Sequence, residues 1–202
     1  GNINNPQVLF LSINPGYHED NWDEEQQNNK ILNGDFAINE CKYLHEYAEN
    51  KKLAKQITNI VLNDNVKYYN HCAETYITSF FNTPNERVLN QQLAILKPEL
   101  KAEHYNIMSD YTKYLLNNLL PNNIVCIGFN VFKRTLDALG ISPSDVKFET
   151  YKTASGRDRV FYKSVRHENT LIHGVLHLSA CHISSVGVDK MREIFKNTIK
   201  FD

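Results

Sequence analysis

The stretch Val8-Leu9-Phe10-Leu11-Ser12-Ile13-Asn14-Pro15-Gly16-Tyr17 decides the fold. Four consecutive apolar residues are typical of a short strand that is buried on both faces, as in a parallel sheet. Pro15 and Gly16 end this strand abruptly. Ligands of open parallel sheets bind just beyond the carboxyl ends of the strands, so we expect Asn14 and Tyr17 at a binding edge. Taken alone, the stretch is explained more simply as an ordinary strand and turn.

The composition is that of a globular protein with one full core. The chain has 202 residues, of which 42% are hydrophobic and 22% charged, and a single domain over residues 1–202 is expected. No apolar run is as long as a membrane span and no signal peptide precedes the first strand, so no membrane contact is expected. The net charge of −1 means that any nucleic-acid site has to be a local patch.

The cysteines indicate a reducing environment. Cys41, Cys72, Cys126 and Cys181 lie far apart and form no C-x-x-C pair. This spacing argues against a zinc ribbon or a disulfide framework, and it predicts a cytoplasmic protein.

Short apolar strands alternate with helical patterns along the rest of the chain. Further strands are predicted at residues 74–81, 124–128 and 170–177. Helices are predicted within residues 36–61 and at 88–96, 105–120, 131–139 and 187–199, with Asn130 capping the fourth of these and Gly140 closing it. Residues 146–165 alternate more, and Ser155-Gly156-Arg157-Asp158 predicts a turn between two short strands. Strands separated by helices predict βαβ units and a central parallel sheet.

Three of the predicted strands end in polar motifs. These motifs are Ser12-Ile13-Asn14-Pro15-Gly16, the segment Tyr76-Ile77-Thr78-Ser79 with Pro84-Asn85-Glu86-Arg87 beyond it, and His177-Leu178-Ser179-Ala180-Cys181-His182-Ile183-Ser184. In this order they resemble the uracil-DNA glycosylase superfamily. The first is similar to the G-I-N-P-G of its mismatch-specific branch. The second is similar to the Y-I-T-N…P…N-R strand of its iron–sulfur branch, and the third to its H-P-S…S loop.

The resemblance implies a three-layer α/β/α sandwich around a central, mostly parallel four-stranded sheet of the uracil-DNA glycosylase type. It also implies a monomer that flips a damaged or mismatched DNA base and hydrolyses its N-glycosidic bond without a cofactor. By resemblance, Asn14 positions the attacking water and His177 stabilises the departing base anion. An amide can orient water but accepts no proton near neutrality, so slow turnover is expected. The simpler alternatives are a turn residue for Asn14 and a buried strand-end histidine for His177.

The same resemblance suggests how the base is held. Phe36 follows Gly34 as the stacking phenylalanine follows a glycine in the iron–sulfur branch, and Trp22 and Tyr17 are rival stacking residues. Ser79 stands where the family often has the asparagine that reads the pyrimidine edge, with Asn82 nearby. A serine offers one rotatable hydroxyl in place of a fixed donor–acceptor pair, which leaves the excised base open.

Contacts to DNA are expected from the third motif and from a basic segment. Ser179 and His182 belong to the loop, and Ile183 is expected either to wedge into the duplex or to belong to the core beneath the last helix. The basic segment contributes Lys152, Arg157, Arg159, Lys163 and Arg166.

No metal is expected. Asn82 replaces a cluster-ligand cysteine, and His173 and His177 lie on a predicted strand rather than at helical zinc spacing. Two alternative functions remain open. One is a weak or inactive homologue that binds nucleic acid or a nucleobase. The other is an unrelated doubly wound enzyme, although the chain has neither a phosphate-binding glycine loop nor a G-x-S-x-G elbow.

Overall fold

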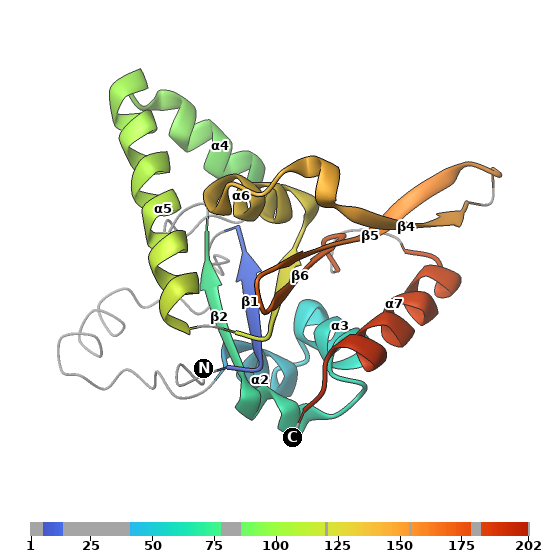
Figure 1. Cartoon of the computed structure of the whole chain (residues 1–202). Coiled ribbons are helices and arrows are strands. Elements are labelled where there is room, and N and C mark those ends of the chain that lie inside the picture. The colour runs from blue at the N-terminus through green and yellow to red at the C-terminus, as the bar shows by residue number, and fades with distance from the viewer. Residues whose placement is uncertain are drawn as a thin grey trace.

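A mixed sheet forms the centre of the molecule (Figure 1). The computed structural model describes residues 6–13, 41–77, 86–119, 121–153, 155–178 and 183–201. Within these ranges six strands follow the order β2-β1-β3-β6-β5-β4. Strands β2, β1, β3 and β6 pair in parallel, whereas β5 is antiparallel to β6 and to β4. The strands are β1 (Val8–Ser12), β2 (Cys72–Tyr76), β3 (Asn123–Ile127), β4 (Lys147–Lys152), β5 (Asp158–His167) and β6 (Thr170–Val175).

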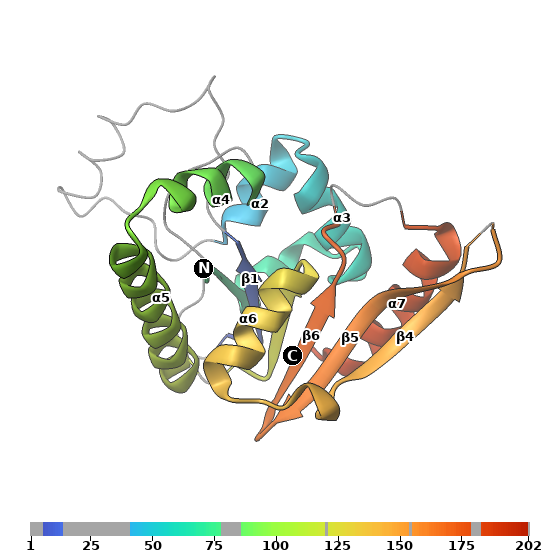
Figure 2. The same ribbon diagram turned by 90° about the horizontal axis from the view of Figure 1, so that it is seen from above.

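Helices cover both faces of the sheet (Figures 1 and 2). Helices α2 (Lys42–Ala48), α3 (Lys52–Ile60) and α7 (Ser185–Thr198) pack on one face. Helices α5 (Pro98–Leu119) and α6 (Phe129–Leu139) pack on the other, where α4 (Glu86–Ile95) lies beside them. Short 3₁₀ helices are present at Val66–His71 and Pro143–Asp145. Of the helices in the described ranges, none combines the length and apolar character needed to cross a membrane.

Strand β1 is buried on both faces, as its apolar run predicts. Val8 and Phe10 belong to the cluster beneath α2, α3 and α7, here called the first core. Leu9 and Leu11 belong to the cluster beneath α5 and α6, the second core. Successive side chains of a strand point to opposite faces, so four apolar residues in a row supply both cores.

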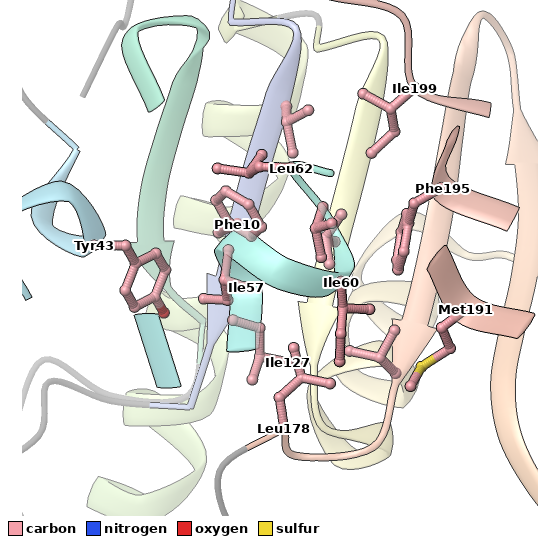
Figure 3. Packing of buried hydrophobic residues seen from close by; sticks show 14 of the residues in the cluster. Phe10, Tyr43, Ile57, Ile60, Leu62, Ile127, Leu178, Met191, Phe195 and Ile199 are labelled. Atoms are coloured by element: carbon pink, nitrogen blue, oxygen red, sulfur yellow. The ribbon is translucent and has the colours of Figure 1, made fainter. Parts of the chain in front are cut away.

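The first core joins the sheet to helices from both ends of the chain (Figure 3). Phe10 of the sheet faces Ile57 of α3, and Met191 and Phe195 project from α7 toward the same cluster. Each of these four side chains is at most 2% exposed. Full burial of such a side chain stabilises the fold by roughly 1.5–3 kcal/mol relative to leaving it in water.

The second core brings α6 unusually close to β6. A Cβ atom built on Gly174 would lie 2.6 Å from Cγ of Phe132. Glycine is therefore required at this position by close packing of strand against helix, not by its backbone angles.

The prediction of a four-stranded sheet is wrong, because the predicted hairpin adds β4 and β5 to the sheet. Strand β5 pairs with β6 from Tyr162↔Val175 to His167↔Thr170. Its Phe161 enters the first core and its Val165 enters the second. Strand β5 is therefore an interior strand with buried residues on both faces. The polar residues that alternate along this segment made it look like an exposed strand in the sequence.

Several helix boundaries also differ from those predicted. The pattern within residues 36–61 is broken into α2 and α3 by a turn in which Asn50 has φ of 62°. Helix α5 begins at Pro98 rather than near residue 105, because proline fits the first helical position, where its missing N–H is not needed. Gly140 closes α6 in the left-handed conformation, as expected.

Candidate active site

The four parallel strands end at one edge of the sheet, called the carboxyl edge below. The pairing continues one residue beyond the strands: the Ile77 N–H donates to the Ser12 oxygen at 3.0 Å, and the Gly128 N–H donates to the Val175 oxygen at 3.0 Å. Only β3 separates β1 from β6. With neighbouring strands roughly 4.8 Å apart, the ends of β1 and β6 lie about 10 Å from each other.

The connections that leave the carboxyl edge diverge between β1 and β3. The chain after β1 leads to α2 and α3 on the side of the first core, whereas the chain after β3 enters α6 on the side of the second core. Ligand crevices of open α/β sheets form where the connections of neighbouring strands go to opposite faces. The described ends of β1 and β3, at Ile13 and Ile127, therefore flank the expected crevice.

Gly128 makes the turn from β3 into α6. Its φ of 109° and ψ of 139° lie in a region that residues with a Cβ atom rarely adopt. The prediction that Asn130 caps α6 is wrong: the helix starts at Phe129, Gly128 is the N-cap residue, and Asn130 lies in the first turn. Because α6 starts directly after β3, its first N–H groups point back toward the carboxyl edge, and Gly128 has no side chain to cap them.

His177, the predicted base-stabilising residue, follows the end of β6 by two positions. Its neighbours anchor it: Leu176 packs against the first core, and Leu178 is buried in it with 4% exposure. His177 itself is half-buried. The backbone on both sides of this imidazole is therefore fixed at the carboxyl edge.

Ile183 packs beneath the start of α7. It contacts the first core, and its Cγ2 lies 2.8 Å from the point where a Cβ on Gly187 would stand. This position favours the alternative in which Ile183 belongs to the core, and the wedge role stays a prediction.

Most of the remaining predicted site residues lie outside the described ranges, and their roles stay predictions. These are Asn14, Tyr17, Trp22, Phe36, Ser79, Asn82, Ser179 and His182. The described chain ends one residue before Asn14 after β1, and two residues before Ser79 after β2. Both residues thus follow strands that end at the carboxyl edge.

The β4–β5 hairpin extends past the carboxyl edge. Tyr162 pairs with Val175, the last residue of β6, so residues 158–161 of β5 continue beyond that strand (Figure 1). Arg157 is exposed beside the hairpin turn, and Arg159 is half-buried on the extension. Arg157 and Arg159, two of the predicted DNA-binding cations, therefore lie on the part of the hairpin that extends beyond the candidate site.

Lys163, another of the predicted cations, lies level with the strand ends. Its Nζ is 4.8 Å from the centre of the Phe129 ring, the first residue of α6, which is a cation–π contact. Arg166 pairs with Leu171 near the opposite end of β6 and lies away from the carboxyl edge. Lys152, which forms an ion pair with Asp158 at 3.0 Å, lies with Arg157 and Arg159 near the hairpin turn. The cations of the basic segment are thus spread along the β4–β5 hairpin, with Lys163 and Arg166 progressively farther from its turn.

His173 forms a buried network with two residues that sequence reasoning missed. Its Nδ1 lies 2.7 Å from the Tyr162 hydroxyl, and its Nε2 lies 3.1 Å from Oδ1 of Asn123. An amide oxygen only accepts, so Nε2 carries the proton and Tyr162 donates to Nδ1. Burial, together with Arg166, lowers the pKa of His173 from 6.5 to about 3. This imidazole is a neutral structural group.

A second cluster that sequence reasoning missed lies between β2 and the start of α2. The Cys41 thiol donates to Oε2 of Glu74 at 3.4 Å. Burial first, and then the charge of Glu74, raise the pKa of Cys41 and of Tyr43 well above their ordinary values. Burial likewise raises the pKa of Cys72, and that of Cys126 to about 12. These thiols stay protonated, so none of the three described cysteines is an activated nucleophile.

Within the described residues, no group of three histidine, cysteine or acidic side chains is arranged to hold a metal ion. No protein-family model matches this sequence, and no curated protein matches it either.

Proposed function

We propose that this protein is a DNA base-excision glycosylase of the uracil-DNA glycosylase type. The observation that carries the proposal is that β1, β2 and β6, which lead into the three resembling motifs, end at one edge of a single sheet. The three motifs are far apart in the sequence, and a shared site explains why each follows a strand of this edge. The divergence of connections between β1 and β3 supports the same location for the bound base.

In the proposed reaction, water attacks the sugar carbon while the glycosidic bond breaks and its electron pair leaves with the base. The attached water then loses a proton to solvent, and the base anion takes up a proton from solvent. Asn14 orients the water, and His177 donates a hydrogen bond to the base anion. A donor of this kind acts best when it is held before the charge develops. The burial of Leu178 and the packing of Leu176 support such a role for His177.

The proposed partner is DNA with a flipped base, bound by a monomer. Arg157 and Arg159 on the projecting hairpin, and Lys163 at its foot, are suited to contact phosphates on either side of that base. We also propose a cytoplasmic location, which the buried thiols of Cys41 and Cys72 support.

The proposal is tested with oligonucleotides that contain uracil, hypoxanthine, xanthine or a mismatch, under single-turnover conditions with excess enzyme. For the base that is excised, His177→Ala is expected to slow cleavage by about 10²-fold or more, with a smaller effect on substrate binding. Asn14→Ala should also slow the reaction. The matched control is His167→Ala, which changes a half-buried histidine at the far end of β5. Unaltered cleavage by a well-folded His177→Ala protein would contradict the assigned site.

A weaker homologue that binds nucleic acid or a nucleobase without turnover is the second candidate. Ser79 in place of the family's asparagine, and Leu178 in place of the proline after the motif histidine, favour it. Salt-dependent binding of all the oligonucleotides, without cleavage of any of them, would identify this function.

A further inference from the structure

A shallow depression lies between α4 and the first turn of α6. Its volume is about 560 Å³, and it is lined by Arg87, Asn90, Gln91, Ala94 and Asn130. The first four are spaced i, i+3, i+4 and i+7, so they form one face of α4. Asn130 faces them from the start of α6, three residues after the end of β3. The depression is therefore next to the carboxyl edge, on the side of the second core.

The depression combines one cationic side chain, which can bind an anion, with neighbouring side-chain amides. Arg87 supplies a permanently charged guanidinium that binds phosphate through two parallel hydrogen bonds. The amides of Asn90 and Gln91 each carry both donors and an acceptor. No carboxylate is among the described residues that line the depression. Such a set fits a ligand that carries both a negative charge and a polar, planar edge.

We propose that the depression is a nucleotide subsite for unpaired DNA, in which Arg87 binds the phosphate and the amides hydrogen-bond to the edge of the base. This inference rests on the proposed function, since it supplies the nucleotide next to the flipped one. Base edges are open to such contacts in an unpaired strand, whereas pairing occupies them in a duplex. The subsite therefore gives the protein a preference for single-stranded DNA.

Substitutions on this face of α4 are expected to leave the fold intact. Arg87, Asn90 and Gln91 are exposed, whereas Leu89 and Leu93 on the opposite face are at most 1% exposed. The helix is held by those leucines, and exposed positions away from special features change stability little. Loss of binding in these variants would thus report on the ligand rather than on unfolding.

The phosphate contact is tested with Arg87→Gln and an undamaged single-stranded 12-mer, by fluorescence anisotropy at several salt concentrations. We expect Kd to rise about tenfold and the slope of log K against log salt to fall by about one, as for one lost phosphate contact. Lys190→Gln, which removes an exposed cation from α7 on the other face, should leave both unchanged. Wild-type Kd and slope for Arg87→Gln would overturn the proposal, as would failure of the wild-type protein to bind the oligonucleotide.

The base contact is tested with Asn90→Ala and Gln91→Ala on adenine, thymine and cytosine 12-mers. We expect the salt slope to stay at the wild-type value while the differences in Kd between the three oligonucleotides shrink. The preference of the wild-type protein for single strands over duplex should shrink with them. If the variants keep the wild-type differences in Kd and the wild-type preference for single strands, the proposed hydrogen bonds to the base are overturned. Because the oligonucleotides are undamaged, these results do not depend on glycosylase activity, which the cleavage assay measures separately.

Discussion

Acidification should weaken the fold through His173, and replacing this residue should remove that effect. The imidazole is fully buried between Tyr162, which donates to its Nδ1, and Asn123, which accepts from its Nε2. A proton on Nδ1 would break the first bond and place a charge in the first core. His173→Gln is the matched variant, because its amide can accept from Tyr162 and donate to Asn123 without titrating.

The magnitude follows from the two pKa values. The pKa of His173 is about 3 in the folded protein and 6.5 in the unfolded chain. Below 6.5 the unfolded chain binds a proton that the folded protein does not, so the stability contributed by neutral His173 is complete above that pH and is lost as the pH falls. The slope approaches about 1.4 kcal/mol per pH unit, which gives about 3 kcal/mol lost by about pH 4.5.

Urea unfolding of the wild-type and His173→Gln proteins at about pH 7.5 and 4.5 measures this effect. The other titrating groups are common to both proteins and cancel in the double difference. Equal pH dependence of the two proteins would refute the reasoning. If the variant does not fold, the nitrogen chemical shifts of His173 in the wild-type protein decide the matter: a charged imidazole at about pH 5 would also refute it.

Two substitutions and one labelling experiment probe the packing of the sheet and helices. Gly174→Ala should lower the free energy of unfolding by about 1–3 kcal/mol because its Cβ meets Phe132, and an unchanged urea midpoint would mean that β6 and α6 are less closely packed. Tyr69→Phe should cost about 1 kcal/mol, since the hydroxyl bonds to Thr58 at 3.0 Å, and a melting curve that matches wild type would contradict this. Cys126, buried and with its pKa raised to about 12, should react with a thiol reagent only on unfolding, so rapid labelling in native buffer would argue against its burial.

The sequence predicts the parallel part of the sheet because its signals are local. The apolar runs at β1 and β3 specify strands buried on both faces, and Gly140 specifies a helix end. The sequence conceals features that depend on distant partners. Lys163 and Ser164 make β5 resemble an exposed hairpin strand, and only its pairing with β6 shows that it is an interior strand.

One part of the candidate site could likewise be predicted from the sequence, and another part could not. Parallel strands place their carboxyl ends together, so the edge where Asn14, Ser79 and His177 follow their strands could be predicted from the order of elements alone. The depression between Arg87 and Asn130 could not, because it depends on how two helices from different parts of the chain are positioned.

The edge of the sheet formed by β4 bears on whether two copies of the protein can pair through their strands. Among the strands that the structure describes, β4 is the last in the order, so no described strand pairs with its outer side. Its register shifts between Glu149 and Thr150, and exposed lysines stand at both of its ends, Lys147 and Lys152. A second copy adding a strand there would have to match an irregular ladder and strip water from two ammonium groups. The irregular ladder and the two lysines of β4 are thus features that disfavour edge-to-edge pairing at this side of the sheet.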